Sequence, residues 1–97
     1  MFDVAWDDDD GYLSFQYVGN TVFAHSEIKH WSKSVYVKAQ LVWECAKKEL
    51  ATKGYSDVYV SIPTGDSKLI KFEKMFGFIP IAEKDGLLLM GQSLKEV

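Results

Sequence analysis

A histidine and a glutamate near the end of one expected strand are the first candidates for chemistry. His25 and Glu27 lie two residues apart in the segment Thr21–Ile28, so they share one face of a sheet, and His30 follows in the next loop. A carboxylate beside an imidazole can act as a general base with its partner. The alternative is an exposed polar strand end. Ser26 lies between them on the opposite face, without a Gly-x-Ser-x-Gly motif. A metal site would need three or four converging ligands and is not expected.

The run Asp7-Asp8-Asp9-Asp10-Gly11 concentrates negative charge near the N-terminus. A calcium loop of the EF-hand type needs acids at alternate positions, then Gly, then a distant Glu. Counting back from Gly11 puts Trp6 at the first ligand position and Tyr17 at the last, so the pattern fails. Asp and Gly suit tight turns, so a solvated turn is expected. The alternative is that Asp7, Asp8, Asp9 and Asp10 contact a basic protein partner.

Two tryptophans can be read either as core or as interface residues. Trp31 is expected in the loop before a helix, and Trp43 is expected inside that helix. Trp is often buried, but exposed Trp is enriched in protein interfaces. Cys45, the only cysteine, also falls inside the helix. A lone core cysteine fits a reducing cytoplasm.

The charge of the chain excludes some classes of partner. The net charge of −3 is asymmetric, because residues 1–20 carry five Asp and no Lys, whereas the remainder carries eleven Lys against nine acids. The sequence contains no Arg, which argues against a nucleic-acid binder, since such proteins usually contact bases and phosphates with Arg. No apolar run approaches the roughly 20 residues of a membrane span.

Alternation and turn residues predict the order βββ-α-β-α-ββ in one domain of 97 residues. Because a strand, a helix and a strand follow one another, the strands Thr21–Ile28 and Asp57–Ile62 are expected to run parallel and adjacent. The other expected elements are strands 2–6, 12–18, 78–83 and 87–92 and helices 35–53 and 66–76.

The helices are expected to bury apolar stripes. Ser32 or Ser34 can cap the first helix, and Asp66 can cap the second. On the first helix the expected core residues, spaced by three and four, are Val35, Ala39, Val42, Ala46 and Leu50, widened by Leu41 and Cys45. On the second helix they are Leu69, Phe72, Met75 and Phe76.

This order, ending in Lys71-Phe72-Glu73-Lys74-Met75-Phe76-Gly77-Phe78, resembles the GNAT (acyl-CoA N-acyltransferase) superfamily. The closing string is similar to that family's "FYEKLGF" signature. The resemblance covers roughly residues 12–93 and implies an α/β fold with a mixed sheet: an antiparallel meander, a βαβ unit, a second helix and a C-terminal hairpin. Short and degenerate chains of this kind resemble small bacteriophage proteins, including an internal virion protein.

The resemblance also implies where a cofactor would bind. The family holds the CoA pyrophosphate on a pattern Gln/Arg-x-x-Gly-x-Gly/Ala, because glycine lets the phosphate approach bare backbone N–H groups. The matching positions here are Lys33, Tyr36 and Lys38, so both glycines are replaced. Asp66 and Glu73 stand where the family often has Asn and a general-acid Tyr. If a phosphate binds at all, the resemblance places it near Lys33, Ser34 and Lys38.

These departures favour a non-catalytic, phage-type protein that binds a host factor or a virion component. Trp31 and the run of acids from Asp7 to Asp10 are the expected contact surfaces. The competing hypothesis is an acetyl-CoA-dependent N-acetyltransferase, with Glu27, assisted by His25, as the base that the family often places there. Under the first hypothesis no cofactor is expected, and the protein is expected in the host cytoplasm or the virion.

Overall fold

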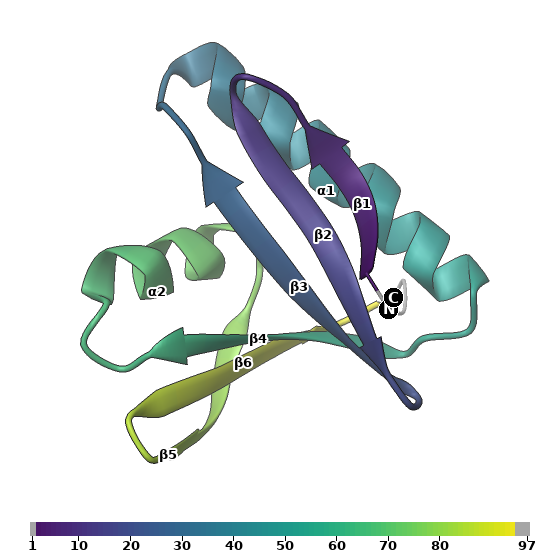
Figure 1. Cartoon of the computed structure of the whole chain (residues 1–97), viewed down its shortest axis with the longest axis vertical. Coiled ribbons are helices and arrows are strands. Elements are labelled where there is room, and N and C mark those ends of the chain that lie inside the picture. The colour runs from purple at the N-terminus through teal and green to yellow at the C-terminus, as the bar shows by residue number, and fades with distance from the viewer. Residues whose placement is uncertain (1, 95–97) are drawn as a thin grey trace.

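The computed structural model describes residues 2–94, and within that range the elements follow the expected order (Figure 1). The helices are α1 (Lys33–Thr52) and α2 (Ser67–Met75). The strands are β1 (Phe2–Asp7), β2 (Gly11–Val18), β3 (Thr21–Ile28), β4 (Asp57–Pro63), β5 (Ile79–Lys84) and β6 (Leu87–Ser93).

The strands form one mixed sheet in the order β1-β2-β3-β4-β6-β5. All neighbours are antiparallel except β3 and β4, which run parallel, as the βαβ order predicts. The register of this central pair contains a single couple, Phe23 with Tyr59. Beyond that couple the two strands diverge, since β3 runs to the upper left and β4 to the left in Figure 1. The sheet is therefore split at its centre.

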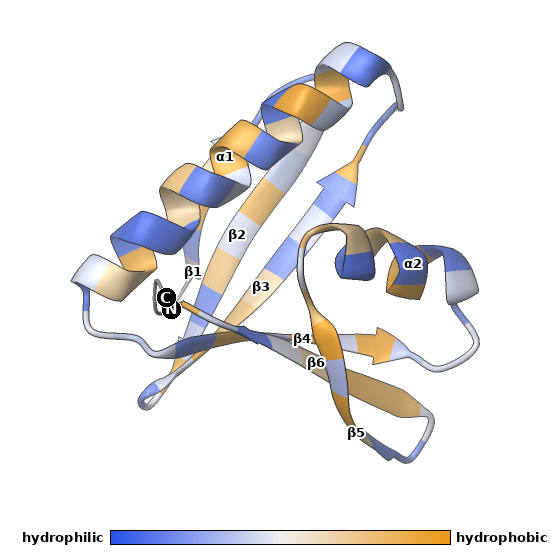
Figure 2. Cartoon of the chain, turned by 180° about the vertical axis from the view of Figure 1, so that it is seen from behind, coloured by the Kyte–Doolittle hydropathy of each residue, from blue (hydrophilic) through white to orange (hydrophobic). Residues whose placement is uncertain are grey.

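Both helices pack on the same face of the sheet (Figure 2). Helix α1 begins two residues earlier than expected, because Ser32 is its cap and accepts a hydrogen bond from the Val35 amide at 3.2 Å. Asp66 caps α2 in the same way through the Leu69 amide at 3.1 Å. Two positions after the end of each helix stands a glycine, Gly54 or Gly77, whose φ angle is positive. Glycine adopts this backbone conformation without strain.

The core lies between the helices and the sheet, and Trp43 is near its centre. Its ring packs against Phe15 and Phe78, with centroids 6.2 and 5.5 Å away. The other buried apolar side chains of the core include Leu13, Val22, Ala39, Ala46, Leu50, Val58, Val60, Ile62, Phe76 and Met90.

The prediction that Leu41 and Cys45 widen the buried face is wrong, because both are exposed. Met75 is also exposed, whereas Val42 and Phe72 are only partly buried. Trp43 explains the first difference. A bulky indole in the core fixes the rotation of α1, and Leu41, two positions away, then lies about 200° round the helix, facing solvent. Trp43 is thus a core residue and not part of a tryptophan surface.

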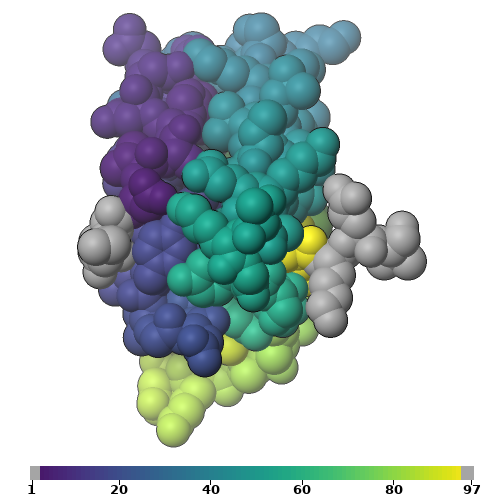
Figure 3. Space-filling view, turned by 90° about the vertical axis from the view of Figure 1, so that its right-hand side faces the viewer, coloured from purple at the N-terminus to yellow at the C-terminus, as the bar shows by residue number. Residues whose placement is uncertain are grey.

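No helix in the described residues covers the opposite face of the sheet (Figures 1 and 2). In the side view α1 lies against the N-terminal strands, and the β5–β6 hairpin protrudes below them (Figure 3). None of the helices within residues 2–94 is long and apolar enough to cross a membrane.

Candidate functional site

A groove lies between the end of β3, the loop that follows it and the start of α2. The groove has a volume of about 280 Å³. The residues that line it are Ser26, Glu27, Ile28, Trp31, Asp66, Lys68, Leu69 and Phe72. Glu27 and Trp31 were singled out in the sequence, and the fold brings both to this groove. His25 is exposed on the same strand, and its Nε2 lies 3.0 Å from Oε1 of Gln16 on β2.

An aromatic contact crosses the groove. The indole of Trp31, from the loop after β3, meets the ring of Phe72 on α2 edge to face, with centroids 5.4 Å apart. Phe72 in turn packs on Phe76 at 4.8 Å. Trp31 therefore joins the loop before α1 to α2, although 54% of its surface stays exposed.

Next to the groove, in a separate small cavity, lies a buried carboxyl group. Glu73 is 4% exposed, and its Oε1 accepts a hydrogen bond from the Ser26 hydroxyl at 3.3 Å. Burial raises the pKa of Glu73 to about 7, and the Ser26 hydrogen bond opposes part of that shift. Both residues line a cavity of about 30 Å³ whose other walls are aromatic and aliphatic. The sequence analysis missed this burial, although Glu73 is four residues from Leu69 and three from Phe76, the spacing of a buried stripe.

The start of α1 differs from a glycine-rich phosphate loop. Residues 36 and 38 lie inside the helix, where the Tyr36 amide already donates to the Ser32 carbonyl at 3.0 Å. The Tyr36 ring packs on Phe76 at 6.1 Å, and the Lys38 ammonium turns to the β1–β2 loop. Within residues 2–94, the amides of Lys33 and Ser34 donate no hydrogen bond. Only these two amides at the helix start are free for an anion.

Three acetyltransferase structures are similar to this chain. PaiA N-acetyltransferase from Thermoplasma acidophilum, solved with coenzyme A, aligns at a TM-score of 0.71 with 15% identity, over 86% of this chain and 52% of that one. YncA from Salmonella typhimurium, solved with acetyl-CoA, aligns at a TM-score of 0.66 with 20% identity, over 91% of this chain and 60% of that one. The ribosomal-protein-S18-alanine N-acetyltransferase from Escherichia coli aligns at a TM-score of 0.64 with 13% identity, over 91% of this chain and 63% of that one.

The chain has the GNAT acetyltransferase fold. At identities of 13 to 20% the likeness concerns the fold, and the chain spans less than two thirds of the length of each of these structures. No family model and no curated protein sequence matches it. The resemblance seen in the closing string Lys71 to Phe78 is thus confirmed at the level of the GNAT fold.

The acidic loop of this GNAT-fold chain is folded onto α1. Lys38 Nζ lies 2.6 Å from Asp8 Oδ2 and 3.0 Å from Asp10 Oδ2. His30 Nε2 lies 2.6 Å from Asp10 Oδ1. The hydrogen bond from Lys38 holds the pKa of Asp8 well below its usual range and also lowers the pKa of Asp10. The loop is therefore largely neutralised by its own chain, and Asp9 remains exposed.

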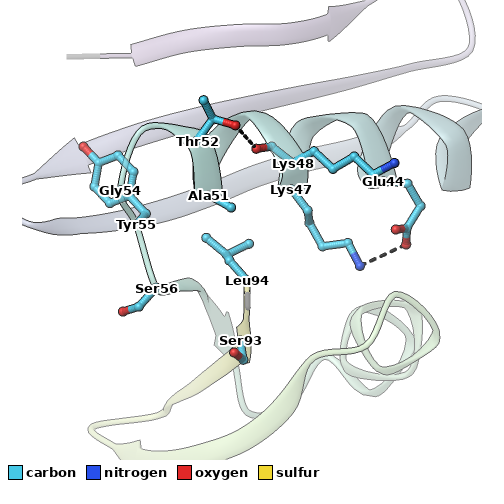
Figure 4. A pocket seen from close by; sticks show the side chains of 10 residues that line it. All are labelled: Glu44, Lys47, Lys48, Ala51, Thr52, Gly54, Tyr55, Ser56, Ser93 and Leu94. Atoms are coloured by element: carbon cyan, nitrogen blue, oxygen red, sulfur yellow. Dashed lines mark hydrogen bonds and ion pairs between the residues drawn. The ribbon is translucent and has the colours of Figure 1, made fainter. Parts of the chain in front are cut away.

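A wider hollow lies at the other end of α1 (Figure 4). It has a volume of about 910 Å³ and runs between the last turns of α1 and the end of β6. Lys47 at its wall is paired with Glu44 at 2.9 Å, and Thr52 donates to the Lys48 carbonyl at 2.9 Å. The walls hold no candidate base or nucleophile from the sequence analysis, so the groove between β3 and α2 remains the candidate site. Within the described residues no group of three or more His, Cys, Asp or Glu side chains could hold a metal ion.

Proposed function

We propose that this protein is a non-catalytic, phage-type member of the GNAT fold that binds another protein, either a host factor or a virion component, in the cytoplasm or the virion. The observation that carries the proposal is the early start of α1 at Lys33. The two positions where the family keeps glycines lie inside the helix, so their amides cannot form a phosphate cradle.

The groove gives further support. A volume of about 280 Å³ is just below the roughly 300–1,000 Å³ of typical small-molecule sites. The carboxylates of Glu27 and Asp66 outnumber the single ammonium of Lys68 in its lining, so the groove repels a polyanionic cofactor. The chain's own residues therefore fit coenzyme A poorly. Trp31, by contrast, is a half-exposed aromatic side chain held in place by Phe72, as residues in protein interfaces often are.

Isothermal titration with acetyl-CoA at near-physiological salt tests the proposal. We expect a dissociation constant no tighter than roughly millimolar, which corresponds to about 4 kcal/mol of binding free energy. Thermal unfolding is a second readout, since a ligand that binds only the folded state must raise the melting temperature. A low micromolar constant together with acetyl transfer to an amine would overturn the non-catalytic function.

The second candidate function is acetyl-CoA-dependent N-acetylation. The observation in its favour is the divergence of β3 and β4 beyond the couple Phe23–Tyr59, beside two unused amides at the start of α1. PaiA and YncA, which share the fold, were solved with coenzyme A and acetyl-CoA. In this case Glu27 would accept the proton of the amine. Glu27→Gln would then abolish transfer while leaving acetyl-CoA binding intact.

A further inference from the structure

Exposed apolar side chains gather on the outer sides of α1 and α2. Trp31 is 54% exposed, Val37 50%, Leu41 64% and Met75 48%. Monomeric proteins scatter single exposed apolar residues, but large side chains in one contiguous area mark interaction surfaces. We call these four residues the helix patch.

Phe72 and Gln40 lie between the members of the helix patch and link them. Trp31 touches Phe72 edge to face, and Met75 follows Phe72 by one helical turn. The Gln40 amide reaches the Met75 carbonyl at 3.5 Å, which joins α2 to the side of α1. Val37 and Leu41 lie one turn apart on α1, on either side of Gln40 in sequence. The patch thus runs from the loop before α1, across α2, to the outer surface of α1.

Lysines surround the helix patch. Lys33 begins α1 near Trp31, and Lys68 and Lys71 lie one turn before Phe72 and Met75 on α2. All three are exposed, and within residues 2–94 none of them forms an ion pair. By contrast Lys29, Lys38 and Lys53 are neutralised by acids of the chain. These three lysines outnumber the two carboxylates near Trp31, those of Glu27 and Asp66, so the border of the patch is net positive and complementary to an acidic partner.

We propose that the helix patch binds an acidic amphipathic segment of another protein. The proposal rests on the protein-binding function above and names the chemistry of the partner. The apolar side of such a segment covers Trp31, Val37, Leu41 and Met75, while its carboxylates pair with the lysine rim. Helices of this type bind in grooves through apolar residues three and four positions apart. Complementary charge sets the orientation of the segment and speeds association.

The probe is a synthetic helical peptide of about 18 residues with Leu on one face and Glu on the other. Its matched control carries Lys in place of Glu. We expect the Glu peptide to bind with a micromolar constant that weakens as salt rises, because salt screens the rim lysines. The Lys peptide should bind at least about tenfold more weakly. Backbone amide shifts in the NMR spectrum should move in α1 and α2.

Matched variants locate the surface. Leu41→Asp and Lys71→Glu should each weaken binding of the Glu peptide by about tenfold or more. The matched control variants are Ile81→Asp and Lys84→Glu on the β5–β6 hairpin, where Ile81 and Lys84 are also exposed. These two control variants should bind the Glu peptide as tightly as the wild type does. All four changes lie on the surface, so melting temperatures should stay close to that of the wild type.

Several results would overturn the proposal. Equal affinity for the two peptides, or binding that Leu41→Asp leaves intact, excludes an acidic segment on this surface. Vesicles of anionic lipid that bind the protein when the Glu peptide does not would assign the patch to a membrane. A dimer in sedimentation that Leu41→Asp dissociates would assign it to a second copy. Acetyl transfer by the same preparation would overturn only the proposed non-catalytic function. If the Glu peptide does not bind and no acetyl transfer is seen, the proposal for the helix patch is overturned and the non-catalytic function stands.

Discussion

The Ser26 hydroxyl donates a hydrogen bond to the Glu73 carboxyl group at 3.3 Å, joining β3 to α2 in a small cavity next to the groove. The pair has an unusual setting, because the walls of its cavity carry no positive charge. Tyr12 is the other titratable residue in that lining, and the charged groups Glu27, Asp66 and Lys68 stand further out, in the groove. Glu73 is therefore favoured in its neutral form.

The first prediction concerns the pH dependence of stability through Glu73. Its pKa rises from 4.5 to about 7 in the folded state, so its contribution to stability is complete below pH 4.5 and is lost as pH rises through about 7. A shift of this size corresponds to a change on the order of 3 kcal/mol in the free energy of unfolding. Urea denaturation of the wild type at pH 5 and pH 8 should show this loss.

Glu73→Gln keeps the shape of the side chain and removes the titration, so its stability should vary little over the same range. Glu83→Gln is the matched control, because Glu83 is exposed and should leave the wild-type pH dependence unchanged. Identical pH profiles for the wild type and Glu73→Gln would show that Glu73 is ionised at neutral pH in the folded protein.

The second prediction concerns the clamp between the acidic loop and α1. Lys38→Met removes the ammonium that both Asp8 and Asp10 bind, so their pKa values should return toward 3.8. Both pKa values are lowered in the folded state. The stabilisation that the two ionised carboxylates give the fold is therefore present above pH 3.8 and is lost as the pH falls below that value. Carboxyl ¹³C chemical shifts followed by NMR measure the two pKa values directly. Unchanged values in Lys38→Met would mean that the backbone of the loop, and not Lys38, sets them.

Much of the fold could be predicted from local sequence signals. Alternation of Val58, Val60 and Ile62 identified the central strand, and the strand-helix-strand order made it parallel to β3. Asp66 was identified as a cap from residue type and spacing alone. These features depend on neighbours within a few residues, so one sequence contains the information.

Features that depend on distant contacts could not be predicted. The orientation of α1 depends on Trp43 packing against Phe15 and Phe78, and without those partners Leu41 was assigned to the core. The clamp joins Lys38 to acids 28 and 30 residues earlier in the chain. Glu73 has the helical spacing of the buried stripe, but the partner that stabilises its carboxyl group there, Ser26, lies 47 residues away in the chain. In each case a long-range contact overrides the local pattern.

The third prediction concerns Gly11, which closes the β1–β2 turn beneath the Trp6 ring. A Cβ at this position would collide with Trp6 Cη2 and would lie 2.6 Å from Trp6 Cζ3, closer than packed carbon atoms can come. Gly11→Ala should therefore displace Trp6 and destabilise the fold by about 1–3 kcal/mol. Gly65→Ala is the control, since a Cβ there meets nothing within 4 Å. Equal stabilities of the two variants in urea would contradict the clash.

The last prediction concerns the Phe76 carbonyl, which accepts two hydrogen bonds. Trp43 Nε1 donates to it at 3.1 Å from α1, and Gln92 Nε2 donates at 3.0 Å from β6. The end of α2 is thus fixed to the first helix and to the sheet through one oxygen atom. Removing one donor leaves the other in place, so Trp43→Phe and Gln92→Leu should each avoid the full cost of an unpaired buried carbonyl.

The double variant should lose more stability than the sum of the two single variants. With both donors gone, the buried oxygen has no partner and its desolvation costs about 1–3 kcal/mol. A double-mutant cycle measured by urea denaturation isolates this excess, because the packing loss of each side chain is already present in the single variants. Additive losses would mean that water reaches the Phe76 carbonyl once the indole is gone.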